Sequence, residues 1–339
     1  MRNFSVIVLS CTLCALATSS PAQADPQGFA LERLGTAAPG AGWLLHDDLN
    51  MHGGLGGALA FTTSYAHDPL RLRSADGSQQ LALVEQQALV EIGAAITWQR
   101  LRFSLHMASP LLVTGQAGTF AGTTFAPGRH AEHYQNCGTQ RVCANLGWNP
   151  DTIADPRLGV DARLYGEPGG RLRLGLGAEL AVPSGLRGDY VSDETWRGLV
   201  RLQAAGDAGL WTWAAQVGGH VRPLDDSGIP GSPRGSELLF GAAAGARWLV
   251  DHGEHAVAVG PELRGQTPLK SLFAQGYTGV EALLGARFES TRSDGSNVRY
   301  RAALGYGLRP EFGTPEWRAV LGVEMFGRSP GLASPAAQR

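Results

Sequence analysis

A polar–apolar alternation of period two recurs along this chain from about residue 50 onward, and no other feature limits the possible folds as much. The stretch from Val84 to Trp98 shows it. One parity is polar, with Glu85, Gln87, Glu91 and Thr97; the other is apolar apart from Gln86, with Val84, Ala88, Val90, Ile92, Ala94, Ile96 and Trp98. Successive side chains of a β-strand point to opposite faces, so each stretch predicts a strand with one apolar and one polar face.

Twelve segments fit this pattern, and most are near the length of about 9 to 11 residues that a tilted transmembrane strand needs. They are 55–65, 83–98, 101–110, 157–165, 171–182, 196–204, 210–221, 237–249, 255–264, 279–289, 298–308 and 316–326. The apolar parity, with Val90, Leu174, Leu284 and Leu321, is expected to face lipid. The sequence therefore predicts an all-β fold, a closed antiparallel transmembrane β-barrel of about 12 strands, with 10 to 14 possible.

The connections between these segments alternate between short and long. The short ones are 99–100, 166–170, 206–209, 251–254 and 290–297, and the long ones are about 66–82, 111–156, 183–195, 223–236, 265–278 and 309–315. Outer-membrane barrels have short periplasmic turns and longer outer loops, whereas a soluble β-sandwich has no reason to sort its loops this way. Tryptophans near strand ends suit the interfacial girdles of such a barrel: Trp98, Trp196, Trp211, Trp248 and Trp317.

The chain start predicts export. A short basic region, an apolar stretch from Val6 to Ala17 and an A-x-A site before Asp25 define a signal peptide over residues 1–24. The alternative is a lipoprotein signal ending at Cys11. We expect a periplasmic lead-in over 25–51, the barrel over 52–326 and a disordered tail over 327–339. The net charge of -2 gives no electrostatic footprint for nucleic acid.

Several short strings resemble one family. They are residues 29–43 (FALERLGTAAPGAGW), 222–247 (RPLDDSGIPGSPRGSELLFGAAAGAR), 259–263 (VGPEL), 281–287 (EALLGAR) and 312–324 (FGTPEWRAVLGVE). They are similar to the N-terminal barrel of Gram-negative OmpA-family outer-membrane proteins. The resemblance implies outer-membrane lipid and lipopolysaccharide as surroundings, and the barrel-assembly machinery as a partner during insertion. Many such relatives continue into a peptidoglycan-binding domain, which the thirteen residues after Phe326 are too few to form, so we expect no peptidoglycan binding through this chain.

The sequence contains two kinds of candidate metal site. His130, His133, Cys137 and Cys143 could supply four zinc ligands, but two cysteines in an exported loop more often form a disulfide, and we predict one between Cys137 and Cys143. The acidic pairs Asp47–Asp48 and Asp225–Asp226 could bind calcium, yet they lack the usual loop spacing, and we interpret them as solvated loop charges. No metal or cofactor is expected.

An enzyme, in this setting a lipid hydrolase, would need a serine oriented against a histidine. His106 and His220 fall on the polar, lumen-facing parity, His255 opens a strand beside a short turn, and the sequence has no Gly-x-Ser-x-Gly motif. The glycine-rich stretches 53–57 and 241–245 lack the Gly-Lys-Ser/Thr of a phosphate loop and are interpreted as strand glycines in crowded places. We predict no catalytic activity.

The lumen-facing parity itself is the remaining candidate site, and on it arginine outnumbers acid. The lumen-lining candidates are Glu85, Glu91, Arg102, Asp161, Arg163, Arg173, Glu179, Arg201, Glu281, Arg287, Arg301, Arg318 and Glu324. A water-filled lumen with surplus guanidinium would favour anions. Alternatively, bidentate pairs with the carboxylates would occlude a barrel of this modest width. The sequence favours a structural or narrow-pore outer-membrane protein, with a porin-like transporter of small anionic solutes as the alternative.

Overall fold

The computed structural model describes residues 28–51, 54–74, 80–120, 123–125, 142–148, 152–226, 228, 234–251, 254–292, 296–311 and 313–327. Their strands are β1 (Leu55–Arg73), β2 (Gln80–Trp98), β3 (Leu101–Phe120), β4 (Thr123–Phe125), β5 (Val142–Trp148), β6 (Arg157–Tyr165), β7 (Arg173–Ala181), β8 (Arg197–Ala208), β9 (Trp211–Val221), β10 (Glu237–Val250), β11 (His255–Pro268), β12 (Gly279–Thr291), β13 (Ser296–Arg309) and β14 (Trp317–Gly327). Two single 3-10 turns, Arg187–Asp189 and Leu269–Ser271, complete the regular structure of these residues.

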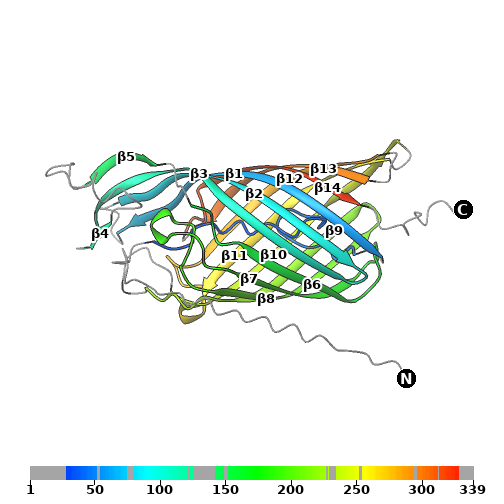
Figure 1. Cartoon of the computed structure of the whole chain (residues 1–339), viewed down its shortest axis with the longest axis horizontal. Coiled ribbons are helices and arrows are strands. Elements are labelled where there is room, and N and C mark those ends of the chain that lie inside the picture. Colours follow the sequence, from blue (N-terminus) through cyan, green and yellow to red (C-terminus); the bar gives the residue numbers. More distant parts are fainter. Residues whose placement is uncertain are drawn as a thin grey trace, which may run out of the picture.

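Twelve of the strands form a closed antiparallel barrel, which confirms the predicted fold (Figure 1). Each strand pairs with its neighbour in the chain, β3 pairs with β6, and β14 returns to β1 with Phe61 opposite Val323. The short strands β4 and β5 pair with β3 outside this ring. Closure gives the backbone N–H and C=O groups of the wall partners within the sheet, as hydrocarbon requires.

The polarity of the two faces of the barrel wall is the reverse of that in a soluble protein, whose apolar side chains point inward. Large apolar side chains point outward; Leu284 and Leu321 are 63% and 62% exposed on the isolated chain. The five tryptophans predicted for the girdles are also exposed there. The side chains of Arg102, Arg173 and Arg318 are fully buried inside. An apolar exterior around a charged interior is the pattern of an outer-membrane β-barrel, and the outer membrane is where this chain resides.

Among the described residues, no helix is long and apolar enough to cross a bilayer.

The barrel is extended at one end, where the sequence predicts loops over 66–82 and 111–156. Instead, β1 continues to Arg73, β2 already begins at Gln80, and β3 continues to Phe120. A buried apolar cluster supports this extension: Phe29, Leu31, Leu70, Leu72, Leu81, Leu83, Val84, Val113, Phe120, Phe125, Tyr190 and Leu224. The pattern-based prediction ended the strands too early because the alternation is interrupted here. Asp68 and Pro69 interrupt it in β1, where the register also shifts, and residues 81–84 and 111–113 are apolar on both parities.

The strand ends that the short connections join lie at the opposite end from β4 and β5 (Figure 1). Outer-membrane barrels keep their short turns in the periplasm. We therefore call the end with the short turns the periplasmic end, and the end with β4 and β5 the outer end.

Candidate functional site

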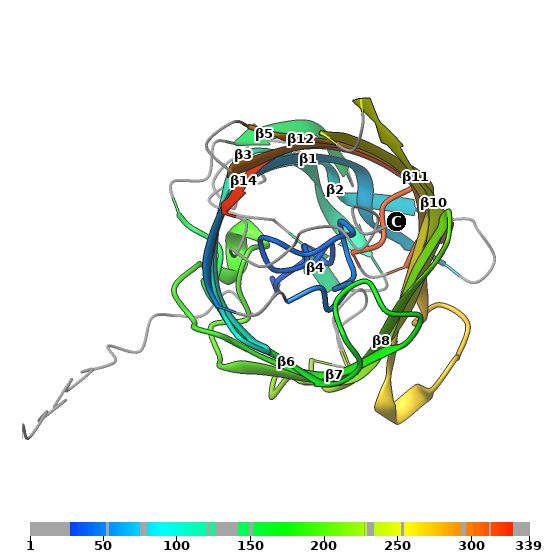
Figure 2. The same cartoon turned by 90° about the vertical axis from the view of Figure 1, so that its right-hand side faces the viewer.

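The lumen of the barrel is occupied by residues 28–51, which we call the plug segment. Figure 2 shows this segment, in dark blue, inside the ring of strands. At the outer end, the amide of Ala30 donates to Asp193 (2.7 Å) and that of Leu31 to the carbonyl of Tyr190 (3.0 Å), both in the connection between β7 and β8. At the periplasmic end, Asn50 Oδ1 accepts from the amide of Gly169 (2.8 Å). The plug segment thus crosses the lumen from the outer end to the periplasmic end.

The plug segment has no regular secondary structure, and side chains of the wall bind its backbone instead. Glu262 of β11 accepts from the amides of Leu44 (2.9 Å) and Leu45 (2.8 Å). Arg299 and Arg301 of β13 donate to the carbonyl of Ala41 at 2.5 and 2.6 Å. These contacts supply the hydrogen-bond partners that buried backbone groups need. The sequence places residues 25–51 in the periplasm as a lead-in; the described part, 28–51, lies within the barrel because the wall satisfies its backbone there.

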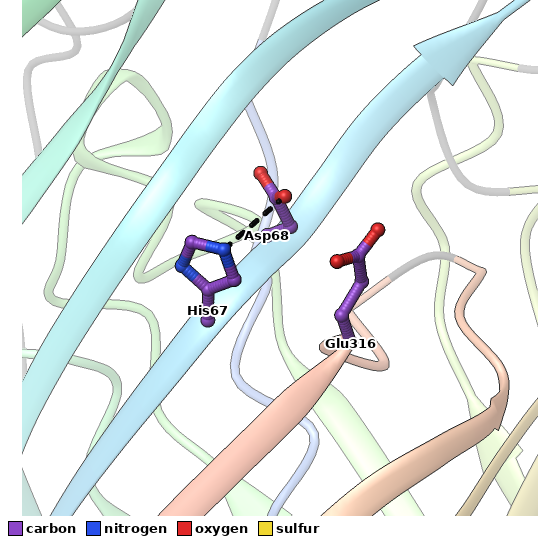
Figure 3. Close-up of side chains that lie close together, drawn as sticks. All are labelled: His67, Asp68 and Glu316. Carbon is purple, nitrogen blue, oxygen red and sulfur yellow. Dashed lines mark ion pairs between the residues drawn. The ribbon is translucent and has the colours of Figure 1, made fainter.

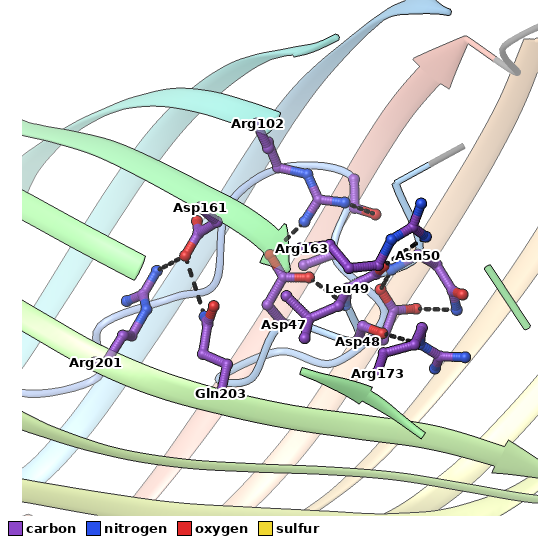
Figure 4. Close-up of polar contacts among 12 residues, drawn as sticks. Asp47, Asp48, Leu49, Asn50, Arg102, Asp161, Arg163, Arg173, Arg201 and Gln203 are labelled. Atoms are coloured by element: carbon purple, nitrogen blue, oxygen red, sulfur yellow. Dashed lines mark hydrogen bonds and ion pairs between the residues drawn. The ribbon is translucent and has the colours of Figure 1, made fainter. Parts of the chain in front are cut away.

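The acidic pair Asp47–Asp48 of the plug segment is buried in the periplasmic half of the lumen (Figure 4). Asp47 accepts from Arg102 of β3 at 2.5 Å. Arg173 of β7 donates to the backbone carbonyl of Asp48 at 2.7 Å. The prediction of solvated loop charge at this pair is therefore wrong, because arginines of the wall surround it. The second pair is more exposed: Asp225 pairs with Lys270 and Asp226 with Arg187.

Beside this pair, further predicted lumen residues meet one another and the plug segment. Arg163 donates to the carbonyl of Leu49 at 3.4 Å. Asp161 accepts from Arg201 at 2.8 Å, and from Gln203 at 3.1 Å (Figure 4). The wall and the plug segment therefore form one polar network at this end of the lumen.

Glu324 of β14 is the centre of a second network, halfway along the plug segment. It accepts from Arg299 (2.8 Å) and Arg301 (2.6 Å) of the neighbouring strand, and from the amide of Gly40. Arg287 of β12 donates to the carbonyl of Gly42, and its guanidinium lies 5.1 Å from the centroid of the Trp43 ring. The same guanidinium therefore contacts the plug segment at two adjacent residues.

A third network ties the outer part of the plug segment to the wall. Arg318 of β14 pairs with Glu281 of β12 at 2.9 Å and with Glu32 of the plug segment at 3.2 Å. Across the lumen, Arg33 of the plug segment pairs with Glu237 of β10 at 3.3 Å.

Glu237 in turn binds Arg222 at 2.9 Å, and Arg222 binds Asp193 at 2.7 Å. Burial alone would raise the pKa of the Asp193 carboxyl, but the charges of Arg222, Arg197 and Arg33 outweigh it and hold that pKa below its usual value. Asp193 is therefore a carboxylate at neutral pH and anchors the amide of Ala30.

Arg157 of β6 joins two of the predicted acids, Glu91 of β2 at 2.6 Å and Glu179 of β7 at 3.5 Å. His106 of β3 binds Glu91 at 3.1 Å. Glu85 is the predicted lumen residue that the structure does not bring to any of these networks. It falls at a register shift between β1 and β2, where the pairing passes from His67–Gln86 to Leu70–Val84, and such irregularities change which face a side chain meets.

The sequence-based selection of lumen residues missed several acids that neutralise the arginines. They are Glu32 and Asp47 of the plug segment, and Asp155, Asp193, Asp207, Glu237 and Glu289 of the wall and its connections. Glu237 and Glu289 were detectable, because each keeps the inward parity of its strand. Asp207 lies in β8 beyond the end predicted for that strand, and the acids in irregular segments carry no periodic signal.

Luminal glycines make room for the plug segment. A Cβ atom added to Gly241 of β10 would lie 2.5 Å from the His46 ring, and one added to Gly245 would lie 2.9 Å from the Trp43 ring. Real Cβ atoms do not approach other atoms so closely. These two positions belong to the glycine-rich stretch that the sequence assigns to crowded strand positions. The crowding comes from the plug segment and from the neighbouring strand β11, whose Leu263 and Val259 carbonyl oxygens would lie 2.6 and 2.4 Å from the added Cβ atoms.

Outside the lumen, His67, Asp68 and Glu316 lie close together where β1 meets β14 (Figure 3). One ligand atom from each lies within 4.8 Å of the others. Both carboxylates already have a cationic partner, however, because Arg71 pairs with Asp68 and lies 3.6 Å from Glu316. A metal ion would have to displace this guanidinium, so we assign no metal to the cluster.

The predicted disulfide lies outside the described residues. Cys137 and the histidines His130 and His133 fall in the part of the chain that the structure does not describe, and for Cys143 only the backbone, in β5, is described. The pairing of Cys137 with Cys143 stays a prediction.

No family model matches this chain, and no curated protein sequence matches it either, so the OmpA-family resemblance stays a hypothesis. Among solved structures, an outer membrane channel from Pseudomonas putida F1 is similar over 81% of this chain and 96% of its own length, with 10% identity and a TM-score of 0.47. The CymD monoaromatic hydrocarbon channel is similar over 83% and 90% of the two chains (11% identity, TM-score 0.38). An anion-selective porin from Comamonas acidovorans is similar over 81% and 98% (12% identity, TM-score 0.30). At this level of similarity, these proteins say nothing about what the present barrel does.

Proposed function

We propose that this protein is a non-enzymatic outer-membrane barrel that its own N-terminal plug segment closes, and that it acts as a narrow pore only when the plug segment is displaced. The observation that carries this proposal is the binding of the plug segment along its whole length by side chains from strands around the lumen. A 12-stranded barrel is narrower than a 16-stranded porin, so a buried peptide is enough to block it.

The histidines that a hydrolase would need are engaged in the lumen. His106 binds Glu91 at 3.1 Å and His220 binds Glu237 at 3.3 Å. Both pairs belong to the networks that hold the plug segment, which supports a structural role for these side chains.

Conductance in planar lipid bilayers tests the proposal. The comparison is between the full chain, a variant lacking residues 28–50, and a control variant lacking residues 328–339. We expect no steady conductance from the full chain and the control, and steady open channels from the plug deletion. A wild-type barrel that conducts as freely as the plug deletion would contradict the proposal, as would a folded plug deletion that stays closed.

A porin-like transporter of small anions is the second candidate, and one observation favours it. Arg102 and Arg287 of the wall make their closest contacts with the plug segment, with Asp47 and with the carbonyl of Gly42. Displacing the plug segment would uncover these guanidinium groups inside the lumen. A lumen lined by uncovered cations attracts anions.

A further inference from the structure

A cavity of about 130 Å³ lies between the plug segment and the wall, toward the outer end of the lumen. The plug segment contributes residues from Ala30 to Thr36. The wall contributes charged side chains from several strands and connections, among them Glu91, Asp155, Arg157, Glu179, Arg197 and Arg264.

The carboxylates around this cavity all have guanidinium partners. Glu91 and Glu179 accept from Arg157. Asp155 accepts from Arg197 at 2.9 Å. Glu32 accepts from Arg318 at 3.2 Å. The acceptors that could bind a further cation are therefore already engaged.

The cavity has spare donors instead. Among the described residues, Arg264 of β11 has no hydrogen-bond or ion-pair partner, although its side chain lines the cavity and the residue is only 8% exposed. The Nη1 atom of Arg264 and the Nε atoms of Arg33 and Arg197 are buried without a hydrogen-bond partner. Every unsatisfied buried polar atom on the described lining is thus a guanidinium N–H donor.

The nearest acids do not remove this surplus of donors. Glu281 lies opposite Arg264 in the pairing of β11 with β12, but its Oε1 accepts from Arg318 at 2.9 Å. Glu281 and Glu32 attract Arg264 from beyond ion-pair distance. A buried donor without a partner costs about 1 to 3 kcal/mol, and more when it is charged, so a ligand that accepts hydrogen bonds is favoured here.

We propose that this cavity binds a small oxyanion, with Arg264 as its principal contact. A guanidinium group presents a planar fork of donors that matches the two oxygens of a carboxylate or a phosphate. The cavity of about 130 Å³ leaves room for a small ligand beside these side chains. This proposal rests on the plugged lumen proposed above, and it names the solute class that the closed barrel retains.

Isothermal titration of the purified full chain, with sodium phosphate and with sodium acetate at constant ionic strength, tests the site. We expect saturable binding of at least one of the two anions. Arg264→Gln should weaken that binding about tenfold or more, because it removes a charge-assisted contact. Arg264→Lys keeps the charge but loses the fork, and should bind with intermediate strength. Arg171→Gln, at an exposed arginine in the periplasmic turn, is the matched control and should bind like wild type.

Absence of saturable binding to the wild type overturns the proposal, and so does equal binding by wild type, Arg264→Lys and Arg264→Gln. If Arg264→Gln does not fold, the comparison of wild type with Arg264→Lys decides the question. Conductance reports on the plug segment and titration reports on the cavity. A wild-type barrel that stays closed and binds neither anion therefore overturns the cavity assignment alone.

Discussion

At the residue scale, the lumen is held together by arginines that share carboxylates and carbonyls. Glu324 shows the arrangement best, because its buried carboxylate accepts from Arg299, Arg301 and the amide of Gly40. Bringing such groups out of water is costly, and the pairs offset that cost only while each member keeps its partner. The networks therefore fix where the plug segment lies more than they add stability.

Glu324→Gln should destabilise the barrel by about 3 to 5 kcal/mol, since it leaves two buried guanidinium groups without their shared negative charge. Urea-induced unfolding in lipid vesicles measures this change. Glu167→Gln is the control, because Glu167 pairs with Arg100 at 3.2 Å in exposed periplasmic turns and should contribute about 0 to 1 kcal/mol. Equal effects of the two substitutions would mean that the Glu324 network contributes no more to the free energy of unfolding than an exposed ion pair does.

At the scale of the elements, the strands and the plug segment differ in how far the sequence predicts them. The wall could be predicted because its period-two alternation is local and repeats in twelve strands. The plug segment could not. It has no periodicity, and its partners are remote in the chain; Leu44 and Glu262, for example, are 218 residues apart. Within the lumen site, the strand parity alone predicts that the arginines of the wall point inward. It predicts neither the acids in irregular segments nor the irregular pairing at Glu85.

The fit between the plug segment and β10 gives a prediction at this scale. Gly241→Leu should displace the plug segment, because a Cβ atom at this position lies 2.5 Å from the His46 ring as well as 2.6 Å from the carbonyl oxygen of Leu263 on β11. We expect channel openings in planar bilayers and faster proteolysis between residues 28 and 51. Gly218→Leu on β9 is the matched control, since a Cβ atom there also lies 2.6 Å from a strand carbonyl, that of Val200, and its three nearest atoms all belong to β8 rather than to the plug segment. A Gly241→Leu barrel that folds and stays as closed and as resistant as the control would show that the plug segment does not depend on this contact.

At the scale of the whole molecule, the direction of the plug segment fixes where the chain enters the barrel. Gly28 lies at the outer end, where its carbonyl accepts from Arg187 at 2.6 Å, and the first strand starts at the periplasmic end with Leu55. The chain therefore passes through the lumen before it begins the wall. Assembly of the barrel therefore has to bring Gly28 to the outer side.

A short epitope placed directly before Gly28 should consequently be accessible to antibody on intact cells. The control carries the same epitope in the periplasmic turn between β8 and β9, inserted between Gly209 and Leu210, and should be detected only after the outer membrane is permeabilised. Detection of both epitopes only after permeabilisation would place Gly28 on the periplasmic side and invert the direction of the plug segment.

The charge of the wall decides what an opened barrel would carry. With residues 28–50 deleted, Arg102 and Arg287 lose Asp47 and the Gly42 carbonyl, and their positive charge acts across a lumen that screens it less than bulk water does. We expect this deletion variant to prefer anions, as measured by the reversal potential under a potassium chloride gradient. Adding Arg102→Gln and Arg287→Gln should shift that potential toward cation preference, whereas adding Arg171→Gln in the periplasmic turn should leave it nearly unchanged. If the two luminal substitutions shift it no more than Arg171→Gln does, these guanidinium groups do not set the selectivity, and the porin-like alternative loses the observation that favours it.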